Sequence, residues 1–138
     1  MRLFSRHAGA VLVVCLCSCG DEQPPTFPVS GKVVFQNGVP VTHAIIEFTR
    51  PSGPMARARL AGDGSFALET AGRPGAVAGT HRIAIIPIAI AEDVSPAQHQ
   101  HGPARAIPAK YRRQETSGLE RDIPTGGATD IVIRLVER

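Results

Sequence analysis

Hydrophobic and polar residues alternate along much of the chain beyond residue 27. The stretches 29–35 (VSGKVVF) and 41–49 (VTHAIIEFT) have the period of two that places one side of a β-strand in a core. The positions expected to face that core are Val29, Gly31, Val33 and Phe35 in the first stretch and Ala44, Ile46 and Phe48 in the second. Both stretches therefore predict half-buried strands.

Further stretches predict strands, and turn residues separate them. They are 57–60, 65–69, 80–87, a short one near 119–123, and 130–136, in which Ile131, Ile133 and Leu135 face one way. No stretch has a convincing helical period, the segment 70–79 predicts a loop, and the 14 glycines and 12 prolines favour turns. The sequence predicts an all-β chain that folds as a single β-sandwich of seven strands, within a range of six to eight.

Two tight turns are predicted where glycine stands beside a short polar residue. Asn37-Gly38 is typical of a type I′ hairpin turn, in which both residues take positive φ. In Gly62-Asp63-Gly64 the glycines permit a left-handed backbone, and Asp63 can accept bonds from amides of its own turn. Calcium takes about six to eight oxygen ligands, so we interpret this lone aspartate as turn chemistry and not as a metal ligand.

Residues 88–129 form the longest segment with few strand signals. Loops of this length in compact domains often have a function, so we expect this one to be the main contact surface. It contains His99 and His101, whose side chains point the same way in an extended chain and could share a metal ion. A third ligand would come from His43, His81 or a carboxylate; the alternative is an exposed histidine pair without a ligand.

The same loop contains the cluster Lys110, Tyr111 and Arg112. One interpretation is that this cluster is a solvated part of the surface. The other is that it binds anionic headgroups or an acidic glycan. These three residues, with His99 and His101, are the candidate binding residues of the chain.

The first 18 residues have the organisation of a signal peptide. Arg2 and Arg6 supply the positive charge, and residues 8–17 form an apolar run. That run is too short to span the membrane as a helix, which needs about 20 residues.

The end of this segment, Leu16-Cys17-Ser18-Cys19, resembles the lipobox of bacterial lipoproteins. A branched apolar residue stands at −3, a small one at −1 and cysteine at +1. Cys15 fits less well because the bulky Val14 would precede it. A metal site and a disulfide are the alternatives. Against a metal site, the cysteines do not have the C-x2-C spacing and no fourth ligand is nearby. Against a disulfide, three cysteines so close together are constrained in geometry.

The lipobox resemblance implies that residues 1–18 are removed and that Cys19 carries a diacylglyceryl group. Residues 19–27 would then be a flexible tether, and 28–138 the sandwich domain. Each buried methylene contributes about 0.8 kcal/mol, so two or three acyl chains anchor a small domain firmly. We expect a lipid-anchored protein of the bacterial cell membrane or outer membrane, facing the periplasm or the exterior.

The charge of the chain argues against a nucleic-acid partner. The net charge of +3 falls to +1 without residues 1–18, which leaves thirteen basic and twelve acidic residues. No basic stripe is interleaved with aromatic residues. No nucleophile elbow or phosphate-binding glycine loop is present either, so we expect no cofactor.

The order of the strand and turn motifs resembles the carboxypeptidase regulatory-like, or transthyretin-like, β-sandwich of small bacterial lipoproteins. The motifs are VSGKV at 29–33, NGVP at 37–40 with AIIEF at 44–48, GDGSF at 62–66, GAVAGT at 75–80, IPAKY at 107–111 and TSGL at 116–119. They cover most of residues 29–136, and His81 occupies a position that is aromatic in the family. The resemblance implies a Greek-key sandwich.

Transthyretin-like hydrolases carry a C-terminal Tyr-Arg-Gly-Ser signature, whereas Tyr111-Arg112-Arg113-Gln114 lies within the chain. We therefore expect a non-catalytic module in envelope structure, adhesion or binding to an envelope protein or carbohydrate. The alternative is a transthyretin-like hydrolase or a metal-binding protein that uses the loop histidines.

Overall fold

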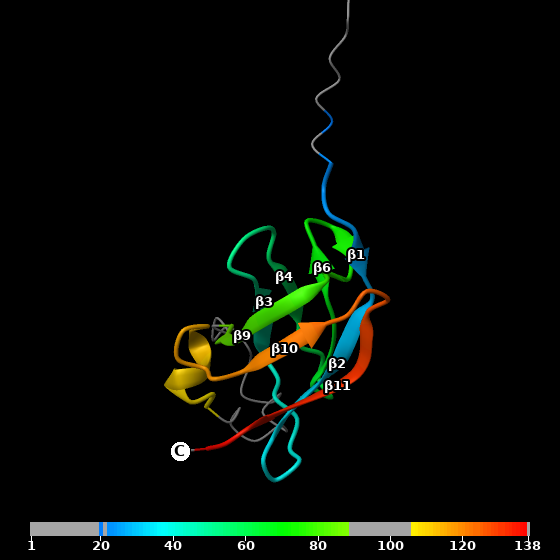
Figure 1. The fold of residues 1–138 in the computed structure, drawn as a ribbon. Helices are drawn as coiled ribbons and strands as arrows, with labels where there is room; N and C mark the ends of the chain where they lie inside the picture. Colours follow the sequence, from blue (N-terminus) through cyan, green and yellow to red (C-terminus); the bar gives the residue numbers. More distant parts are fainter. Residues whose placement is uncertain (1–19, 21, 89–105, 138) are drawn as a thin grey trace, which may run out of the picture.

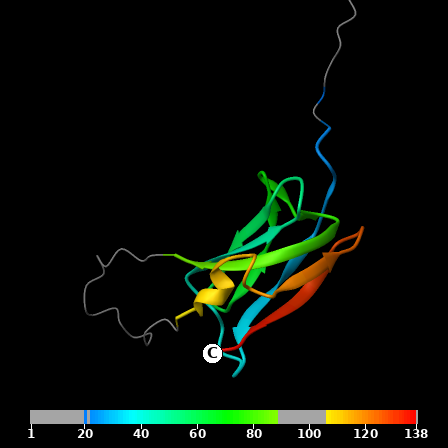
Figure 2. The same ribbon diagram turned by 60° about the vertical axis from the view of Figure 1, so that its left-hand side comes forward.

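The computed structural model describes residues 20, 22–88 and 106–137. Their regular structure is β, apart from one 3₁₀ turn, and two sheets pack face to face (Figures 1 and 2). The predicted all-β class is confirmed, and the packing is that of a β-sandwich.

The described residues contain eleven strands, four of which have only two residues. The strands are β1 (Thr26–Phe27), β2 (Val29–Phe35), β3 (Ala44–Thr49), β4 (Ala56–Arg59), β5 (Ser65–Ala67), β6 (Glu69–Thr70), β7 (Arg73–Pro74), β8 (Ala76–Val77), β9 (Gly79–Pro87), β10 (Glu120–Ile123) and β11 (Ala128–Leu135), and the 3₁₀ turn η2 is Ala109–Arg112. Three of the two-residue strands fall in or at the edge of the predicted loop 70–79, because alternation over two residues leaves no signal.

The strands divide between a large sheet, a small sheet and a short pair. The large sheet has the order β10-β9-β3-β4-β6-β7, the small sheet has the order β11-β2-β5, and β1 pairs with β8. The longest strand, β9, lies between β3 and β10 in antiparallel register. The expected strand near 119–123 therefore exists as β10, within the segment that the sequence treated as a loop.

The core lies between the two main sheets. Its largest fully buried aliphatic and phenyl side chains are Val33, Phe35, Ile133 and Leu135 from the small sheet, Ile46, Phe48, Ile83, Ile85 and Ile123 from the large one, and Val41 and Leu68 from the segments between strands. Each such side chain contributes about 1.5–3 kcal/mol on burial. The predicted inward faces of β2, β3 and β11 are confirmed at these positions, whereas Gly31 and Ile131 are only half-buried.

His81 is the one histidine of the described core. Its side chain has no exposed surface, and its ring centroid lies 5.9 Å from that of Phe48. Because a carbonyl oxygen only accepts, the Nε2–H of His81 donates to the Val77 carbonyl at 2.8 Å, while Nδ1 has no partner. His81 thus fills the position of a core aromatic residue.

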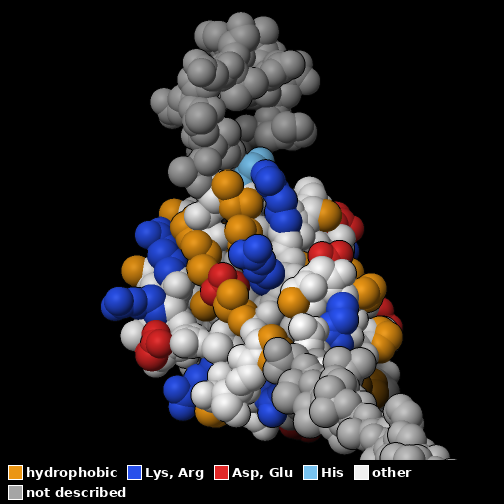
Figure 3. All heavy atoms as spheres, turned by 90° about the horizontal axis from the view of Figure 1, so that it is seen from above, with side chains coloured by type: hydrophobic (Ala, Val, Ile, Leu, Met, Phe, Trp, Pro, Cys, Tyr) orange, Lys and Arg blue, Asp and Glu red, His pale blue; other side chains and the backbone are white. Residues whose placement is uncertain are grey.

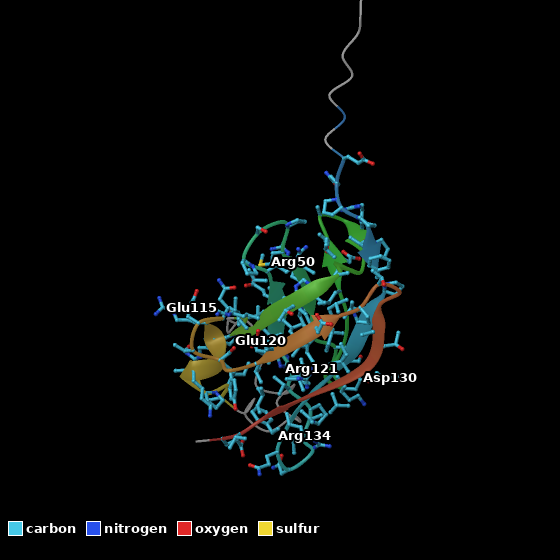
Figure 4. The ribbon with its side chains drawn as sticks, in the orientation of Figure 1. Arg50, Glu115, Glu120, Arg121, Asp130 and Arg134 are labelled. Atoms are coloured by element: carbon cyan, nitrogen blue, oxygen red, sulfur yellow. The ribbon has the colours of Figure 1, made fainter. Side chains whose placement is uncertain are left out.

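β2 and β11 pair in parallel, with a bulge at their entry. Ala128 is opposite Val29 and Ile131 is opposite Gly31, so β11 has one extra residue there, and Asp130 takes φ of 61° (Figure 4). A Cβ atom on Gly31 would collide with the Ile131 carbonyl oxygen. Glycine is required at this position because the two backbones approach so closely.

A side chain spans the open seam between β10 and β11. The Arg121 guanidinium donates to the Val132 carbonyl at 3.4 Å and to the Glu120 carbonyl at 2.9 Å (Figure 4). Arg121 therefore joins the edge of the large sheet to the edge of the small one.

A turn is present at Asn37-Gly38, but the predicted type I′ is wrong. Gly38 has φ of 85°, but Asn37 does not have positive φ, and its Oδ1 accepts from the Val39 N–H at 3.2 Å. The Gly38 N–H donates to the Phe35 carbonyl and the Phe35 N–H to the Val39 carbonyl, the pattern of a three-residue loop with a glycine bulge.

The strands that flank this turn do not form the expected hairpin. Only Val34 and Pro40 bridge, and the chain then crosses to the other sheet, where β3 begins at Ala44 and not at residue 41. The alternation of apolar and polar residues cannot reveal this crossover. Each sheet buries one face, so a strand has the same pattern in either sheet.

The residues before β2 are attached to the sandwich. The sequence assigned 19–27 to a tether, whereas Thr26–Phe27 pairs with β8 and Arg73 Nη1 donates to the Pro24 carbonyl at 3.2 Å. The chain therefore meets the folded body at Pro24.

Gly31→Ala should lower the free energy of unfolding by about 3 kcal/mol, the upper end of the range for overpacking, because the methyl group meets backbone that cannot move without breaking the β2–β11 pair. Urea denaturation measures the loss. Gly62→Ala is the control: nothing lies within 4 Å of a Cβ there, so its effect should stay within about 0.5 kcal/mol. Equal stabilities of the two variants would contradict the close approach.

Candidate functional site

A pocket of about 440 Å³ opens where the chain crosses between the sheets. It is lined by Thr42, His43, Arg59, Leu60 and Gly62, and we call it the His43 pocket. Its volume is within the range of about 300–1,000 Å³ typical of small-ligand sites.

The crossover and the pairing of the strands position these side chains. The His43 carbonyl accepts from the Ile88 N–H at 2.8 Å, and the Ala44 carbonyl accepts from the Leu60 N–H at 2.9 Å. These bonds extend β3 toward β9 on one side and toward β4 on the other. The entry of β3 therefore forms one wall of the pocket and the exit of β4 forms the other.

His43 has a left-handed backbone, which is uncommon for a residue other than glycine. Its φ is 53°, in the left-handed region where glycine is least strained. The Thr42 hydroxyl lies 3.0 Å from His43 Nδ1, and the imidazole is exposed. The Thr42 hydroxyl thus restrains the orientation of the His43 imidazole. A glycine would suit this backbone better but would provide no side chain at the pocket.

Arg59 adds a positive charge at the pocket. It lies opposite Ile45 across the β3–β4 pair and is exposed. In the described part of the chain no carboxylate forms an ion pair with it. Its neighbour Arg57 differs, because it lies between the cross-strand partners Glu47 and Glu69 and outside the pocket.

The sequence did not single out the His43 pocket. From the sequence, His43 is only one of the possible third ligands for His99 and His101, and Arg59 is an unremarked position of the predicted strand 57–60. Only the sheet crossover brings residues 42–43 next to 59–62, and no local pattern signals it.

Tyr111 lies in the core and not on a binding surface. It is 4% exposed, and its hydroxyl accepts from the Val136 N–H at 2.9 Å. The turn η2 packs against β9, and Lys110 Nζ lies 4.8 Å from the Tyr111 ring centroid. The side chain of Tyr111 closes the sandwich beside the end of β11.

Arg112 is tied to its own turn. Its Nε and Nη2 donate to the Ile107 carbonyl at 3.2 and 3.0 Å. Lys110 and Arg112 remain exposed on the outside of η2. The structure therefore separates the predicted trio into one core residue and two surface cations.

Cys19, His99 and His101 lie outside the described residues. Within the described ranges, no three His, Cys, Asp or Glu side chains are grouped so that they could hold a metal ion. No helix among these residues is long and apolar enough to cross a membrane.

The turn at Gly62-Asp63-Gly64 has the predicted aspartate chemistry. Asp63 Oδ1 accepts from the Ser65 N–H at 3.0 Å and from the Ser65 hydroxyl at 2.6 Å. Gly64 has φ of 79°, whereas Gly62, contrary to expectation, does not take positive φ. Bonds from the Ser65 hydroxyl and amide, with Lys32 nearby, hold the pKa of Asp63 below its ordinary 3.8.

Lys and Arg side chains are scattered over the face of the sandwich drawn in Figure 3. On the face in Figure 3, Lys and Arg side chains are spread more widely than Asp and Glu, with hydrophobic side chains between them. This face is the one from which residues 22–25 leave the body (Figure 1).

Comparison of the chain with protein-family models, with curated proteins and with solved structures finds no match.

Tyr111→Phe should lower the free energy of unfolding by about 1–2 kcal/mol, because it leaves the Val136 N–H without its partner. Chemical denaturation measures the loss. Lys110→Ala is the matched control, since it removes only an exposed contact to the same ring and should cost less than about 1 kcal/mol. A Tyr111→Phe variant as stable as the wild type would contradict the hydroxyl bond.

Asp63→Ala should lower the free energy of unfolding at neutral pH, and the loss should be smaller in acid. The folded-state pKa of Asp63 is depressed, so its contribution is present above the unfolded-state pKa and is lost as pH falls through the folded value. Thermal unfolding from neutral pH to below 3.8 should show the curves of wild type and variant converging. A constant gap between them would contradict a role for the ionised carboxylate.

Proposed function

We propose that this protein is a non-catalytic, lipid-anchored module of the bacterial envelope that binds a ligand or partner. The observation that carries the proposal is Leu16-Cys17-Ser18-Cys19 at the end of a charged and then apolar leader. A carbohydrate or another envelope protein is the class of partner that this proposal implies.

The attachment of the chain at Pro24 supports an anchored arrangement. Arg73 holds the Pro24 carbonyl, and β1 follows directly. From a lipid on Cys19 to Pro24 the chain spans at most roughly 17 Å, since an extended chain reaches about 3.3–3.6 Å per residue. The β1–β8 end of the sandwich would therefore lie close to the membrane.

The charge at this end favours an anionic membrane surface. Arg50 lies against Gly79 beside β8, where a Cβ on Gly79 would be 3.3 Å from Arg50 Nε, and Figure 4 shows Arg50 toward the end where the chain enters. Arg73 lies at the same end. Each such basic side chain near an anionic leaflet contributes about 1 kcal/mol.

The placement of Tyr111 supports a module without catalysis over a hydrolase. A catalytic hydroxyl must be free to reach a substrate, but this one is buried and accepts a hydrogen bond from Val136. Lys110 and Arg112 on the outside of η2 are then contact residues on a rigid surface.

Cys19→Ser should abolish lipidation, because a hydroxyl does not replace the thiolate nucleophile. In cells fed radiolabelled palmitate, the wild type should be labelled and should enter the detergent phase of Triton X-114. The variant should lose both properties.

Cys17→Ser and Cys15→Ser are the matched controls, since each removes one sulfur and leaves Cys19 in place. Both should still be labelled and should remain in the detergent phase. An unlabelled wild type in the aqueous phase would overturn the proposed anchor, and loss of label in all three variants would overturn its assignment to Cys19.

A further inference from the structure

We propose that the His43 pocket binds a compact oxyanion, the carboxylate or phosphate of a sugar-sized envelope ligand. The proposal adds a ligand class to the proposed binding module, and its geometry does not depend on the lipid anchor. It is carried by a cation that has no ion-pair partner among the described residues, an imidazole held on a left-handed backbone, and an apolar wall.

The cation is Arg59. A guanidinium recognises carboxylate and phosphate groups through two parallel donors, and it does so best when no protein carboxylate occupies it. No described carboxylate pairs with Arg59. The acidic group next to the pocket in sequence, Asp63, is engaged with Ser65 and lies 4.0 Å from Lys32.

His43 is the second feature. The crossover between the sheets needs a left-handed residue, and glycine would adopt φ of 53° with the least strain. The chain has histidine there instead, with Thr42 Oγ1 at 3.0 Å from Nδ1. Left-handed residues other than glycine concentrate at functional sites, and of the three among the described residues, His43, Ala71 and Asp130, His43 is the one that lines the pocket.

The shape of the pocket limits the size of the ligand. Leu60, 5% exposed, supplies an apolar wall, and Gly62 has open space above its Cα. A pocket of about 440 Å³ fits one sugar-sized group with its acidic substituent against Arg59 and His43.

The pocket lies at the opposite end of β9 from the β1–β8 pair. β9 starts at Gly79, just after β8, and ends next to His43, whose carbonyl bonds Ile88. Its nine residues cover about 30 Å at roughly 3.3 Å per residue. With the lipid at the β1–β8 end, which rests on the proposed function, the anchor and the pocket lie at opposite ends of β9.

The test titrates the purified full chain, in mild detergent, with sodium glucuronate, with inorganic phosphate and with neutral glucose. Amide chemical shifts and calorimetry report binding. We expect saturable binding of glucuronate, phosphate or both, weakened by added salt, and none of glucose. The anion that binds identifies which of the two acidic groups the pocket takes.

Arg59→Gln should weaken binding at least tenfold, and Arg57→Gln, the same change two residues away on the same strand, should leave it within twofold. His43→Gly should also weaken binding while keeping the fold, because glycine tolerates the left-handed backbone better. Thermal unfolding of each variant verifies that the fold is intact.

Three results would overturn the proposal. They are no saturable signal from either anion up to millimolar concentration, binding of glucose equal to that of glucuronate, and equal losses in Arg57→Gln and Arg59→Gln. Phase partition of the same preparations tests the lipid anchor separately, so either idea can fail without the other.

Discussion

The parallel pairing of β2 with β11 brings the first long strand and the last strand together, and the sandwich closes through it. Because β2 also pairs with β5, it is the central strand of the small sheet. The close passage of the Ile131 carbonyl over Gly31 sets the register, and the bulge that ends at Asp130 absorbs one extra residue. Arg121 of β10 then joins the large sheet to β11, and Tyr111 of η2 accepts from the Val136 N–H just after β11 ends. The pairing places the side chains of Ile133 and Leu135 of β11 in the core between the two sheets.

Packing and hydrogen bonds must supply this closure without covalent help. The three cysteines of the chain lie within positions 15–19, so no disulfide can form among the described residues. The stability of the fold therefore depends on the burial of aliphatic side chains between the sheets and on the contact between the His81 and Phe48 rings in that core. It also depends on turns that need a residue with a left-handed backbone. A sandwich of this size keeps only a small net free energy of folding, so a single backbone collision is a large perturbation.

The crossover before β3 links stability to the proposed ligand site. One bend carries the chain from the small sheet to the large one, and it places His43 beside the exit of β4. The proposed lipid anchor and the proposed pocket then occupy opposite ends of β9. Such a division would leave the pocket free to meet a ligand while the β1–β8 end rests near the membrane.

The sequence by itself determined the all-β class, the positions of the longer strands and the inward faces of β2, β3 and β11, because alternation reports burial directly. It also predicted that Asp63 forms hydrogen bonds within its turn, because the donors on Ser65 are only two residues away in the chain. Only the tertiary structure decided that β2 and β3 belong to different sheets and that Asn37 has no positive φ. It also decided that Tyr111 lies in the core and that His43 meets Arg59. The backbone at Asn37 depends on local hydrogen bonds of a three-residue loop, which the Asn-Gly pair does not distinguish from a two-residue turn. The other three depend on contacts between residues distant in the chain, and the period of two is identical for a strand in either sheet.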